Sequence, residues 1–443
     1  MRKDEVGRDT IAAIATAPGR GGIGVVRVSG PGVSRIAAAV AGALPARRHA
    51  TLLVFRDGLG ARIDEGIALF FEAPNSYTGE DVLELQGHGG PIVLQMVLTA
   101  CIDAGARLAE PGEFTRRAYF EGKLDLAQAE AVADVIDAAS REAVRSAQRS
   151  LSGEFSTAVH ALVSHLTELR ALIEAMLDFP EEEIDLIHGT DALTRLAAIR
   201  TETAQLLGRS RQGRLLAAGI HVVIAGPPNV GKSSLLNRLT GEDRAIVTSR
   251  AGTTRDVLRE PIEIHGVPIV IVDTAGLRES SDEVERLGIA RTHRELQGAD
   301  VVLAISEAAR SSEALEEFSS SAARIDVFNK IDLAPGFEAP AGRYPTVQVS
   351  AKTGTGIEAL REAILKAAGW SSTGESLFLA RERHLRALES ATTNLEAAER
   401  VSGRWELFAE ELRLAQVALG QITGEVTADD LLGEIFSKFC IGK

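Results

Sequence analysis

The sequence has almost no cysteine, no long apolar run and no apolar segment at its start. Cys101 and Cys440 are its two cysteines, which excludes a disulfide framework and a zinc site built on cysteine ligands. No apolar stretch approaches the ~20 residues that a membrane-spanning helix needs. The first residues, Met1 to Glu5, are mostly charged, unlike those of a secretory signal peptide. These absences predict a cytoplasmic protein.

The net charge of −14 argues against indiscriminate nucleic-acid binding, which needs an excess of lysine and arginine. Local basic patches can still occur in a protein with a negative net charge. There are two candidates, which are either RNA contacts or solvated helix faces: Arg145 with Arg149, and Arg209 with Arg211 and Arg214. With 45% hydrophobic and 25% charged residues, the composition is that of a globular protein. At roughly 150 residues per domain, 443 residues predict about three domains.

The pattern of the sequence changes along the chain. Residues 1–120 alternate short β-like runs with glycine clusters, which predicts an α+β domain. Apolar residues recur at helical spacing over 121–216 and again over 375–443, which predicts one all-α domain in two parts. Between them, residues 217–374 predict an inserted α/β domain, with a parallel sheet covered by helices on both faces. The predicted strands are 11–17, 25–29, 51–55, 67–72, 82–86, 220–225, 269–272, 301–305, 325–328 and 347–349.

The inserted segment contains a phosphate-binding motif between its first predicted strand and the following helix. Gly226, Gly231, Lys232 and Ser233 fit the pattern G-x-x-x-x-G-K-[ST]. In such a turn, backbone N–H groups and the positive end of the helix dipole hold the phosphates of a nucleotide. Lys232 is then expected to reach the β- and γ-phosphates, and Ser233 to bind Mg²⁺.

Three further motifs follow, each at the end of a predicted strand. Asp273–Gly276 fits D-x-x-G, whose aspartate holds Mg²⁺ through water and whose glycine amide contacts the γ-phosphate. Asn329–Asp332 fits N-K-x-D, and its carboxylate can accept both donors of the guanine edge, whereas adenine offers no such pair. Ser350–Lys352 suits a loop that contacts the base. The four ordered motifs predict a P-loop GTPase domain.

Two features of this domain concern hydrolysis. In the segment Gly252–Asp256, one threonine is expected to complete the Mg²⁺ coordination, with Thr254 as the preferred candidate and Thr253 as the alternative. Leu277 stands where Ras-type GTPases carry a water-orienting glutamine, so another polar group must act on the water. The candidates, which alternatively form the solvated start of a helix, are Asp282, Glu283 and Glu285.

Beyond these motifs, the chain resembles the MnmE family, also called TrmE, the GTPases of tRNA wobble-uridine modification, over essentially its whole length. The phosphate-binding turn has the family's form G-x-P-N-x-G-K-S, and a G domain inserted into a helical domain is the family's layout. The chain ends in Phe439–Lys443, the family's C-x-G-K terminus. Four N-terminal motifs also match: PGRGGIG at 18–24, NSYTGED at 75–81, QGHGG at 86–90 and KLDLAQAE at 123–130.

The resemblance implies potassium-dependent GTP hydrolysis, with K⁺ in the place of an arginine finger. Its ligands would come from Asn229, Thr248, Arg250 and Thr253, and Arg250 could offer only its backbone carbonyl. Such a cation neutralises charge that develops during phosphoryl transfer. Glu285 matches the family's catalytic glutamate. Motifs and resemblance together predict GTP contacts at Asn229, Val230, Gly231, Lys232, Ser233, Ser234, Thr248, Ser249, Arg250, Ala251, Gly252, Thr253, Thr254, Asp273, Thr274, Ala275, Gly276, Asn329, Lys330, Asp332, Ser350, Ala351 and Lys352.

The resemblance also implies that the N-terminal domain forms a homodimer and binds a one-carbon donor of the 5-formyltetrahydrofolate type. The matching contacts are Arg27, Glu84, Lys123 and Lys443. A lysine or arginine can pair with the glutamate tail of a folate, and a carboxylate can bind its pterin edge. Cys440 is either a reactive thiol near the one-carbon unit or a small apolar filler. The short, glycine-containing tail is expected to need a docking surface.

The function that the resemblance implies is GTP-dependent addition of a carboxymethylaminomethyl-type group to C5 of the wobble uridine of certain tRNAs. An MnmG-type flavoprotein would be the partner, in a heterotetramer or larger complex, and would supply FAD. No Rossmann fingerprint follows a strand here, so this chain itself is expected to bind no flavin. Two other classes fit less well. A ribosome-assembly GTPase would carry a basic RNA-binding domain after the G domain, and a dynamin-type GTPase a basic amphipathic surface helix.

Overall fold

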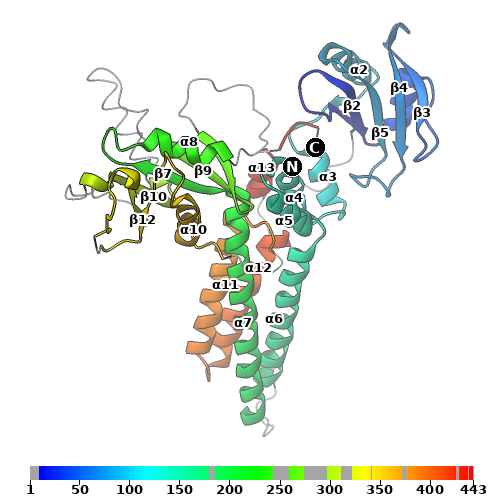
Figure 1. Ribbon diagram of the computed structural model, residues 1–443. Helices are drawn as coiled ribbons and strands as arrows, with labels where there is room; N and C mark the ends of the chain where they lie inside the picture. Colours follow the sequence, from blue (N-terminus) through cyan, green and yellow to red (C-terminus); the bar gives the residue numbers. More distant parts are fainter. Residues whose placement is uncertain are drawn as a thin grey trace, which may run out of the picture. The chain divides into compact units, whose positions relative to one another are not determined.

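The computed structural model describes residues 9–178, 185–242, 259–273, 297–310, 322–340, 342–371, 377–425, 429–437 and 439–442 (Figure 1). The chain forms two compact units. Unit 1 comprises Met1–Ala133, Phe155–Glu168 and Arg413–Lys443, and unit 2 comprises Asp134–Glu154 and Leu169–Leu412. Two long helices, α6 (Glu154–Asp178) and α12 (Trp405–Thr423), contribute to both. Among the helices in the described ranges, none has the length and apolar content needed to cross a membrane.

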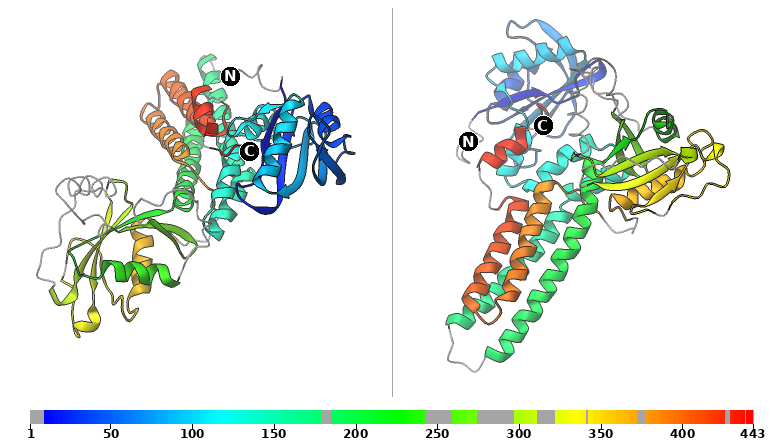
Figure 2. Two further views of the ribbon diagram at one scale, coloured as in Figure 1. Left: turned by 90° about the horizontal axis from the view of Figure 1, so that it is seen from above. Right: turned by 90° about the vertical axis from the view of Figure 1, so that its left-hand side faces the viewer.

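Unit 1 is built on a six-stranded sheet with helices α1 (Val33–Ala41) and α2 (Pro91–Asp103) (Figure 2). Its order is β3-β4-β5-β2-β1-β6, and every pair is antiparallel except β1 with β6. The strands are β1 Ile11–Ile14, β2 Gly21–Ser29, β3 Thr51–Arg56, β4 Arg62–Phe71, β5 Val82–Gly89 and β6 Arg107–Leu108. The predicted α+β class and the five predicted strands are confirmed, with shifted ends. The short strand β6 was not predicted.

Alternation along the strands divides the side chains between the two faces of this sheet. Leu83 and Leu85 are buried in one cluster with apolar residues of α1 and α2. Arg27 and Glu84, which are partners in the β2–β5 register, therefore lie on the opposite face. At one end of that face, Phe114 of α3 (Glu113–Phe120) packs against β1. The polar pair thus lies on the face that α1 and α2 leave uncovered.

Remote segments of the chain complete unit 1. An apolar cluster joins α4 (Leu126–Asp137), α13 (Asp429–Ser437) and the tail, and its buried members are Leu126, Ala129, Leu432, Ile435, Phe436 and Phe439. In the helical part, Gln416 of α12 donates from Nε2 to Thr167 Oγ1 of α6 over 3.1 Å. The end of the chain is therefore part of the N-terminal unit.

In unit 2, α7 (Asp185–Ala218) and α11 (Glu382–Arg400) lie side by side (Figure 2), and α5 (Arg141–Leu151) also contacts α7. The chain that leaves the inserted domain crosses the last turns of α7. There, Ser150 Oγ of α5 donates to the carbonyl oxygen of Leu379 over 3.2 Å. The guanidinium of Arg209 lies 4.2 Å from the centre of the Phe378 ring. The returning chain is therefore held against two helices.

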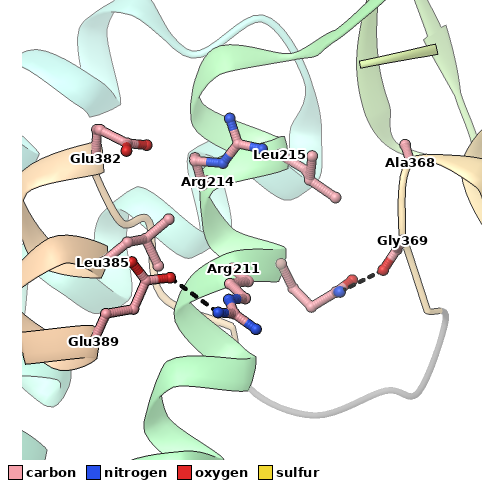
Figure 3. A pocket seen from close by; sticks show the side chains of 9 residues that line it. Arg211, Arg214, Leu215, Ala368, Gly369, Glu382, Leu385 and Glu389 are labelled. Carbon is pink, nitrogen blue, oxygen red and sulfur yellow. Dashed lines mark hydrogen bonds and ion pairs between the residues drawn. The ribbon is translucent and has the colours of Figure 1, made fainter. Parts of the chain in front are cut away.

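A polar pocket of about 430 Å³ lies between the end of α7, the start of α11 and the end of α10 (Ile357–Ala367), as Figure 3 shows. In it, Arg211 Nη2 pairs with Glu389 Oε1 at 2.9 Å. Gln212 donates from Nε2 to the carbonyl oxygen of Gly369 over 2.7 Å, and its Oε1 accepts from the N–H of Ser371 over 3.0 Å. These contacts hold the exit of the inserted domain against α7.

The inserted domain has a six-stranded sheet in the order β12-β11-β10-β7-β9-β8. Its elements are β7 Ile220–Ala225, β8 Arg259–Ile264, β9 Val267–Asp273, β10 Val301–Glu307, the short helix η3 Ala308–Arg310, β11 Ala323–Asn329, the short helix η4 Ile331–Leu333, and β12 Thr346–Gln348. The α/β class is confirmed. The five predicted strands pair in parallel, as predicted, and the edge strand β8, which was not predicted, is antiparallel to β9. Their hairpin turn, His265–Gly266, has positive φ at both residues, as such tight turns require.

Helices α8 (Lys232–Glu242) and α10 lie on the same face of this sheet, where they share an apolar cluster with all six strands and the end of α7. On the other face, a second cluster is formed by Val223, Ala225, Val272 and Val302. That helices also cover this second face stays a prediction. The domain boundary predicted at residue 217 falls in the last turn of α7, which ends at Ala218, and the boundary predicted at 375 lies outside the described residues.

Candidate functional site

The phosphate-binding turn joins β7 to α8, and its backbone requires glycine at two points. Gly226, Asn229 and Gly231 have φ values of 151°, 64° and 92°. A β-carbon on Gly226 would lie 2.3 Å from the carbonyl oxygen of Ile305, and one on Gly231 would lie 2.5 Å from Asn329 Nδ2. Larger residues are excluded at both positions. The glycines therefore let the turn approach the ends of β10 and β11.

Lys232 is the first residue of α8, and its ammonium group folds back over the turn. Nζ donates to the carbonyl oxygens of Gly226 and Pro227 over 2.7 and 2.8 Å, and the residue is only 8% exposed. Together with the N-terminal dipole of α8, this positive charge suits bound phosphates. Ser233 follows in the first turn and is exposed, so its hydroxyl can be offered to a metal ion.

The base-recognition motifs meet at the carboxyl ends of β11 and β12. Asn329 is 1% exposed; its Nδ2 donates to the carbonyl oxygen of Val230 over 2.8 Å, and its Oδ1 accepts from the N–H of Ala351 over 3.1 Å. Ser350 Oγ donates to Asp332 Oδ1 over 2.6 Å. Asn329 thus ties the phosphate-binding turn to the loop at 350–352, and Ser350 orients the carboxylate of Asp332.

A pocket of about 190 Å³ lies among these residues and extends from the base-recognition motifs to the first turn of α8. It is lined by Gly231, Ser234, Asn329, Lys330, Asp332, Leu333, Ala351 and Lys352. All of these except Leu333 are predicted GTP contacts. A carboxylate at one end of the pocket and the phosphate-binding turn at the other are what a guanine nucleotide needs.

Two residues that support this pocket were not predicted. Arg238 of α8 donates from Nε to the carbonyl oxygen of Ala351 over 3.1 Å, and from Nη2 to that of Lys352 over 2.7 Å. Glu307, at the end of β10, pairs with Lys330 Nζ at 3.3 Å. Neither residue belongs to a recognised motif, so only the tertiary structure reveals them.

Much of the predicted catalytic machinery lies outside the described residues, including three of the four predicted K⁺ ligands and the catalytic glutamate. Asp273 is described only as the last residue of β9, in register with Ile224 at the end of β7. That position is next to the phosphate-binding turn. The predicted residues outside the described ranges are Thr248, Ser249, Arg250, Ala251, Gly252, Thr253, Thr254, Thr274, Ala275, Gly276, Asp282, Glu283, Glu285 and Lys443.

The second predicted site centres on a partly buried ion pair in unit 1. Arg27 of β2 donates from Nε and Nη2 to Glu84 Oε1 of β5 over 3.0 and 2.9 Å. The guanidinium also lies 5.4 and 5.7 Å from the ring centres of Tyr77 and Phe114, within range of cation–π attraction. The structure therefore brings the predicted pair together and adds two aromatic residues that sequence reasoning missed.

Tyr77 is itself held in place by α3. Its hydroxyl lies 2.8 Å from Thr115 Oγ1. Burial raises the pKa of Tyr77 above its ordinary value, although the hydrogen bond with Thr115 and the charge of Arg27 act in the opposite direction. The phenol is therefore uncharged near neutral pH and packs against Arg27 as a neutral ring.

The C-terminal tail docks beside this ion pair. Arg27 Nη1 donates to the carbonyl oxygen of Gly442 over 3.5 Å, and the N–H of Gly112 donates to that of Cys440 over 3.4 Å. Gly442 has a φ of 100°, and a β-carbon on it would lie 2.3 Å from the carbonyl oxygen of Ile14. The N-terminal unit thus supplies the docking surface expected for the tail.

Two further residues predicted for this site, Lys123 and Cys440, are at the surface. Lys123 Nζ donates to the carbonyl oxygen of Pro74 over 3.0 Å, beside the segment 75–81. Cys440 is exposed, so its alternative interpretation as an apolar filler is wrong: the thiol is accessible to solvent instead of being packed in a core. Its reactivity stays a prediction.

A buried charge cluster fixes α3 next to the ion pair. Arg117, which is 1% exposed, donates to Asp9, Glu80 and Glu113 over 2.7, 3.0 and 3.0 Å. Burial alone would raise the pKa of Glu113, but hydrogen bonds from Arg107, a backbone N–H and Arg117 hold it below its ordinary value. Charge-assisted hydrogen bonds therefore join the start of β1, the segment 75–81 and α3.

Two family models and several relatives match this chain. A model described as the MnmE helical domain matches residues 126–440, and one described as the GTP-binding protein TrmE N-terminus matches residues 10–123. A protein named tRNA modification GTPase MnmE from Azoarcus sp. (strain BH72) is 60% identical over 444 residues, which cover 98% of each chain. The protein of that name from Thiobacillus denitrificans (strain ATCC 25259 / T1) is 59% identical over 439 residues, again 98% of each chain.

Among solved structures, the FeoB G-domain from Methanococcus jannaschii matches 34% of this chain and 98% of its own, at 28% identity with a TM-score of 0.26. The two family models together extend over nearly all of the chain, and the two relatives match it at close to full length. The chain therefore belongs to the MnmE (TrmE) family.

Proposed function

We propose that this chain is a P-loop GTPase that hydrolyses GTP in the modification of tRNA. The observation that carries the proposal is the position of Asn329, which bonds the phosphate-binding turn to the 350–352 loop beside the carboxylate of Asp332. The name of the two relatives, tRNA modification GTPase, supports the part that concerns tRNA.

Base recognition rests on Asp332. Ser350 orients its carboxylate, which would accept the two N–H donors of the guanine edge. Adenine lacks this pair of donors, so its binding would leave the carboxylate unsatisfied, at a cost of about 1–3 kcal/mol. Lys232 and the N–H groups of the turn would hold the phosphates at the other end of the pocket.

Hydrolysis would use Mg²⁺ and K⁺, which neutralise the charge that develops on the phosphates. Ser233 and Thr254 would hold Mg²⁺. The K⁺ ligands would be the side-chain oxygen of Asn229, oxygens of Thr248 and Thr253, and the backbone carbonyl of Arg250. The chemistry of this donor set fits, because oxygen ligands are what both hard cations prefer.

The attacking water needs a polar group that Leu277 cannot supply. Glu285 is our candidate, and it would act on the water indirectly. A group that serves only the transition state contributes to kcat and leaves nucleotide affinity nearly unchanged. Glu285→Ala should therefore lower kcat by roughly 10²-fold, typical of positioned acid–base groups.

In the N-terminal unit, a 5-formyltetrahydrofolate-type donor would bind beside Arg27, Glu84, Lys123 and Lys443. The support for this site is the preorganised guanidinium of Arg27, which is held by Glu84 and by aromatic rings next to the docked tail. Cys440 would place an accessible thiol nearby. The same unit would form the homodimer.

The modification would be addition of a carboxymethylaminomethyl-type group to C5 of the wobble uridine, in the cytoplasm. An MnmG-type flavoprotein would supply FAD and the reductive chemistry, in a complex of two or more chains of each kind. This chain would contribute the one-carbon donor site and the GTPase.

Nucleoside analysis of bulk tRNA from cells lacking this protein tests the proposal. We expect the wobble uridine to lack its modification, and expression of the wild-type chain to restore it. Expression of Glu285→Ala should restore it poorly. Intact modification combined with a defect in ribosomal subunits would overturn the proposal in favour of a ribosome-assembly GTPase.

A further inference from the structure

Arg238 of α8 holds the loop at 350–352 by two consecutive carbonyl groups. Its Nε donates to the carbonyl oxygen of Ala351 over 3.1 Å, and its Nη2 donates to that of Lys352 over 2.7 Å. A β-carbon on Gly354 would lie 3.8 Å from the guanidinium carbon, so the guanidinium also packs against the following turn of the chain. Because a guanidinium is a rigid planar fork, it fixes the orientation of both peptide groups that it binds.

The backbone N–H groups of residues 350–355 are bonded within the protein, with one exception. The bonded groups are those of Ser350, Ala351, Thr353, Gly354 and Thr355. The N–H of Lys352 is the exception, since no atom in the described part of the chain accepts a hydrogen bond from it. Lys352 is exposed, so this donor can be offered to a ligand without the cost of a buried, unbonded N–H.

Arg238 determines where this N–H points. The carbonyl of Ala351 and the N–H of Lys352 belong to one peptide group, and in a planar trans peptide these two bonds point in opposite directions. Since the carbonyl is directed at Arg238, the N–H is directed away from that side chain. Ala351 and Lys352 both line the pocket of the base-recognition motifs. The loop therefore keeps one fixed donor available for a base in this pocket.

The donor lies close to the carboxylate that is proposed to read the guanine edge. Ser350, two residues before Lys352, donates from Oγ to Asp332 Oδ1 over 2.6 Å. If Asp332 accepts the ring N–H and the amino group of guanine, the next group along the same edge of the base is O6. Guanine O6 is an acceptor, whereas adenine carries an amino donor at this position. A fixed N–H would therefore bind guanine and would face an unmatched donor on adenine.

We propose that Arg238 is a positioning residue for guanine selectivity: by holding the carbonyl groups of Ala351 and Lys352, it keeps the Lys352 N–H directed at O6. Arg238 itself does not touch the nucleotide. The inference rests on the base recognition proposed above and adds a separate contribution to it. Asp332 reads the ring N–H and the amino group of the base, and Arg238 acts on the contact with O6.

Competition of modified nucleotides with a fluorescent GTP analogue on the full-length protein tests this role. The probe 6-thio-GTP replaces O6 by sulfur, a weak acceptor, and ITP keeps O6 but lacks the amino group that Asp332 would read. In Arg238→Ala, the affinity for GTP should fall about five- to tenfold, which corresponds to one hydrogen bond. The affinity for 6-thio-GTP should change little, because its contact at position 6 is already weak. The ratio of GTP to ITP affinity should stay as in the wild type.

Two further variants separate positioning from a general effect on the helix. Arg238→Lys should recover part of the loss, because an ammonium group can donate to one of the two carbonyls but lacks the planar fork. Asn237→Ala changes the exposed neighbour of Arg238 in α8 and should bind GTP, 6-thio-GTP and ITP like the wild type. In the wild type, ATP should bind much more weakly than GTP, and Arg238→Ala should narrow this difference.

An equal loss of affinity for GTP and 6-thio-GTP in Arg238→Ala would overturn the inference, because the substitution would then act on the whole pocket and not on the contact with O6. Wild-type affinity for GTP in Arg238→Ala would also overturn it. If the wild type binds ATP as tightly as GTP, the base recognition proposed for Asp332 is wrong and the inference is lost with it. If Asp332→Asn loses the preference for guanine while Arg238→Ala keeps it in full, only the role of Arg238 is wrong.

Discussion

Gly213 of α7 lies directly against the backbone of Phe378: a β-carbon on Gly213 would lie 1.6 Å from the carbonyl oxygen of Phe378. Phe378 is 2% exposed and belongs to the chain that returns from the inserted domain to α11. Next to it, Gln212 bonds Gly369 and Ser371. The entry and the exit of the inserted domain are therefore held together within one turn of α7, and no side chain fits at position 213.

Gly213→Ala should lower the free energy of unfolding of unit 2 by about 1–3 kcal/mol, because the methyl group would force the returning chain off the helix. Urea unfolding followed by tryptophan fluorescence measures this, since Trp370 packs against the core of the inserted domain. Gly208→Ala is the matched control: Gly208 has open space around it in the same helix, and alanine there should add about 0.5–1 kcal/mol. Equal effects of the two substitutions would contradict the contact.

Glu113→Gln should destabilise unit 1 by about 1–3 kcal/mol at neutral pH, because it removes the buried anion that Arg117 and Arg107 share and leaves Arg117 with only Asp9 and Glu80. Hydrogen exchange of the α3 and β1 amides measures it. Glu110→Gln, at the exposed Glu110–Arg116 pair, should cost less than 1 kcal/mol. If both variants lose protection from hydrogen exchange to a similar degree, burial of the Arg117 cluster does not increase its contribution to stability.

The same glutamate predicts a pH dependence. The folded-state pKa of Glu113 is lowered from its ordinary value of 4.5, so its contribution to stability is complete above pH 4.5. The contribution is lost as the pH falls through the lowered pKa. Protection of the α3 amides in the wild type should decline on acidification below 4.5, and less steeply in Glu113→Gln. Parallel curves for the two proteins would show that Glu113 is not the titrating group.

Asp332→Asn should weaken GTP binding about 10- to 100-fold and improve binding of xanthosine triphosphate. The amide can donate to the carbonyl that xanthine carries in place of the guanine amino group. Competition with a fluorescent GTP analogue gives both affinities. Glu338→Gln changes another exposed carboxylate in the same region and should leave the preference for guanine intact. An unchanged preference in Asp332→Asn would remove this residue from base recognition.

Replacing K⁺ by Na⁺ at constant ionic strength should slow GTP hydrolysis by about 10²-fold, as expected when a charge stabiliser of the transition state is lost. Asn229→Gly removes the predicted side-chain ligand, and glycine tolerates the φ of 64° without strain. This variant should bind GTP normally and hydrolyse it at the same slow rate in both salts. Equal wild-type rates in the two salts would eliminate the role of K⁺.

Gly442→Ala should displace the tail from β1, because its β-carbon would lie 2.3 Å from the carbonyl oxygen of Ile14. We expect weaker binding of 5-formyltetrahydrofolate, as in a chain lacking residues 440–443, with GTP binding and dimerisation unchanged. Gly433→Ala in α13, where nothing lies within 4 Å, should behave like the wild type. If Gly442→Ala and the truncated chain both bind the folate with full affinity, the tail does not contribute to folate binding.

The sequence alone determined the features that depend on near neighbours in the chain. Apolar runs predicted the buried strands from β7 to β12, except β8, because a strand buried on both faces is apolar at every position. The spacing of Gly226, Gly231 and Lys232 identified the phosphate-binding turn, since its geometry is set within eight residues. The N-terminal and C-terminal motifs indicated the family in the same way.

Only the tertiary structure decided what depends on distant residues. Strand β8 has polar residues at an edge position, so its apolar signal was weak, and its antiparallel pairing follows from the hairpin turn at His265–Gly266. The contacts of Arg27 with Glu84, and of Arg238 with Ala351, join residues 57 and 113 positions apart. Local patterns carry no information about such pairs, because sheet register and helix packing bring them together. For the same reason, the requirement for glycine at 213 became evident only from the backbone of Phe378, which packs against it.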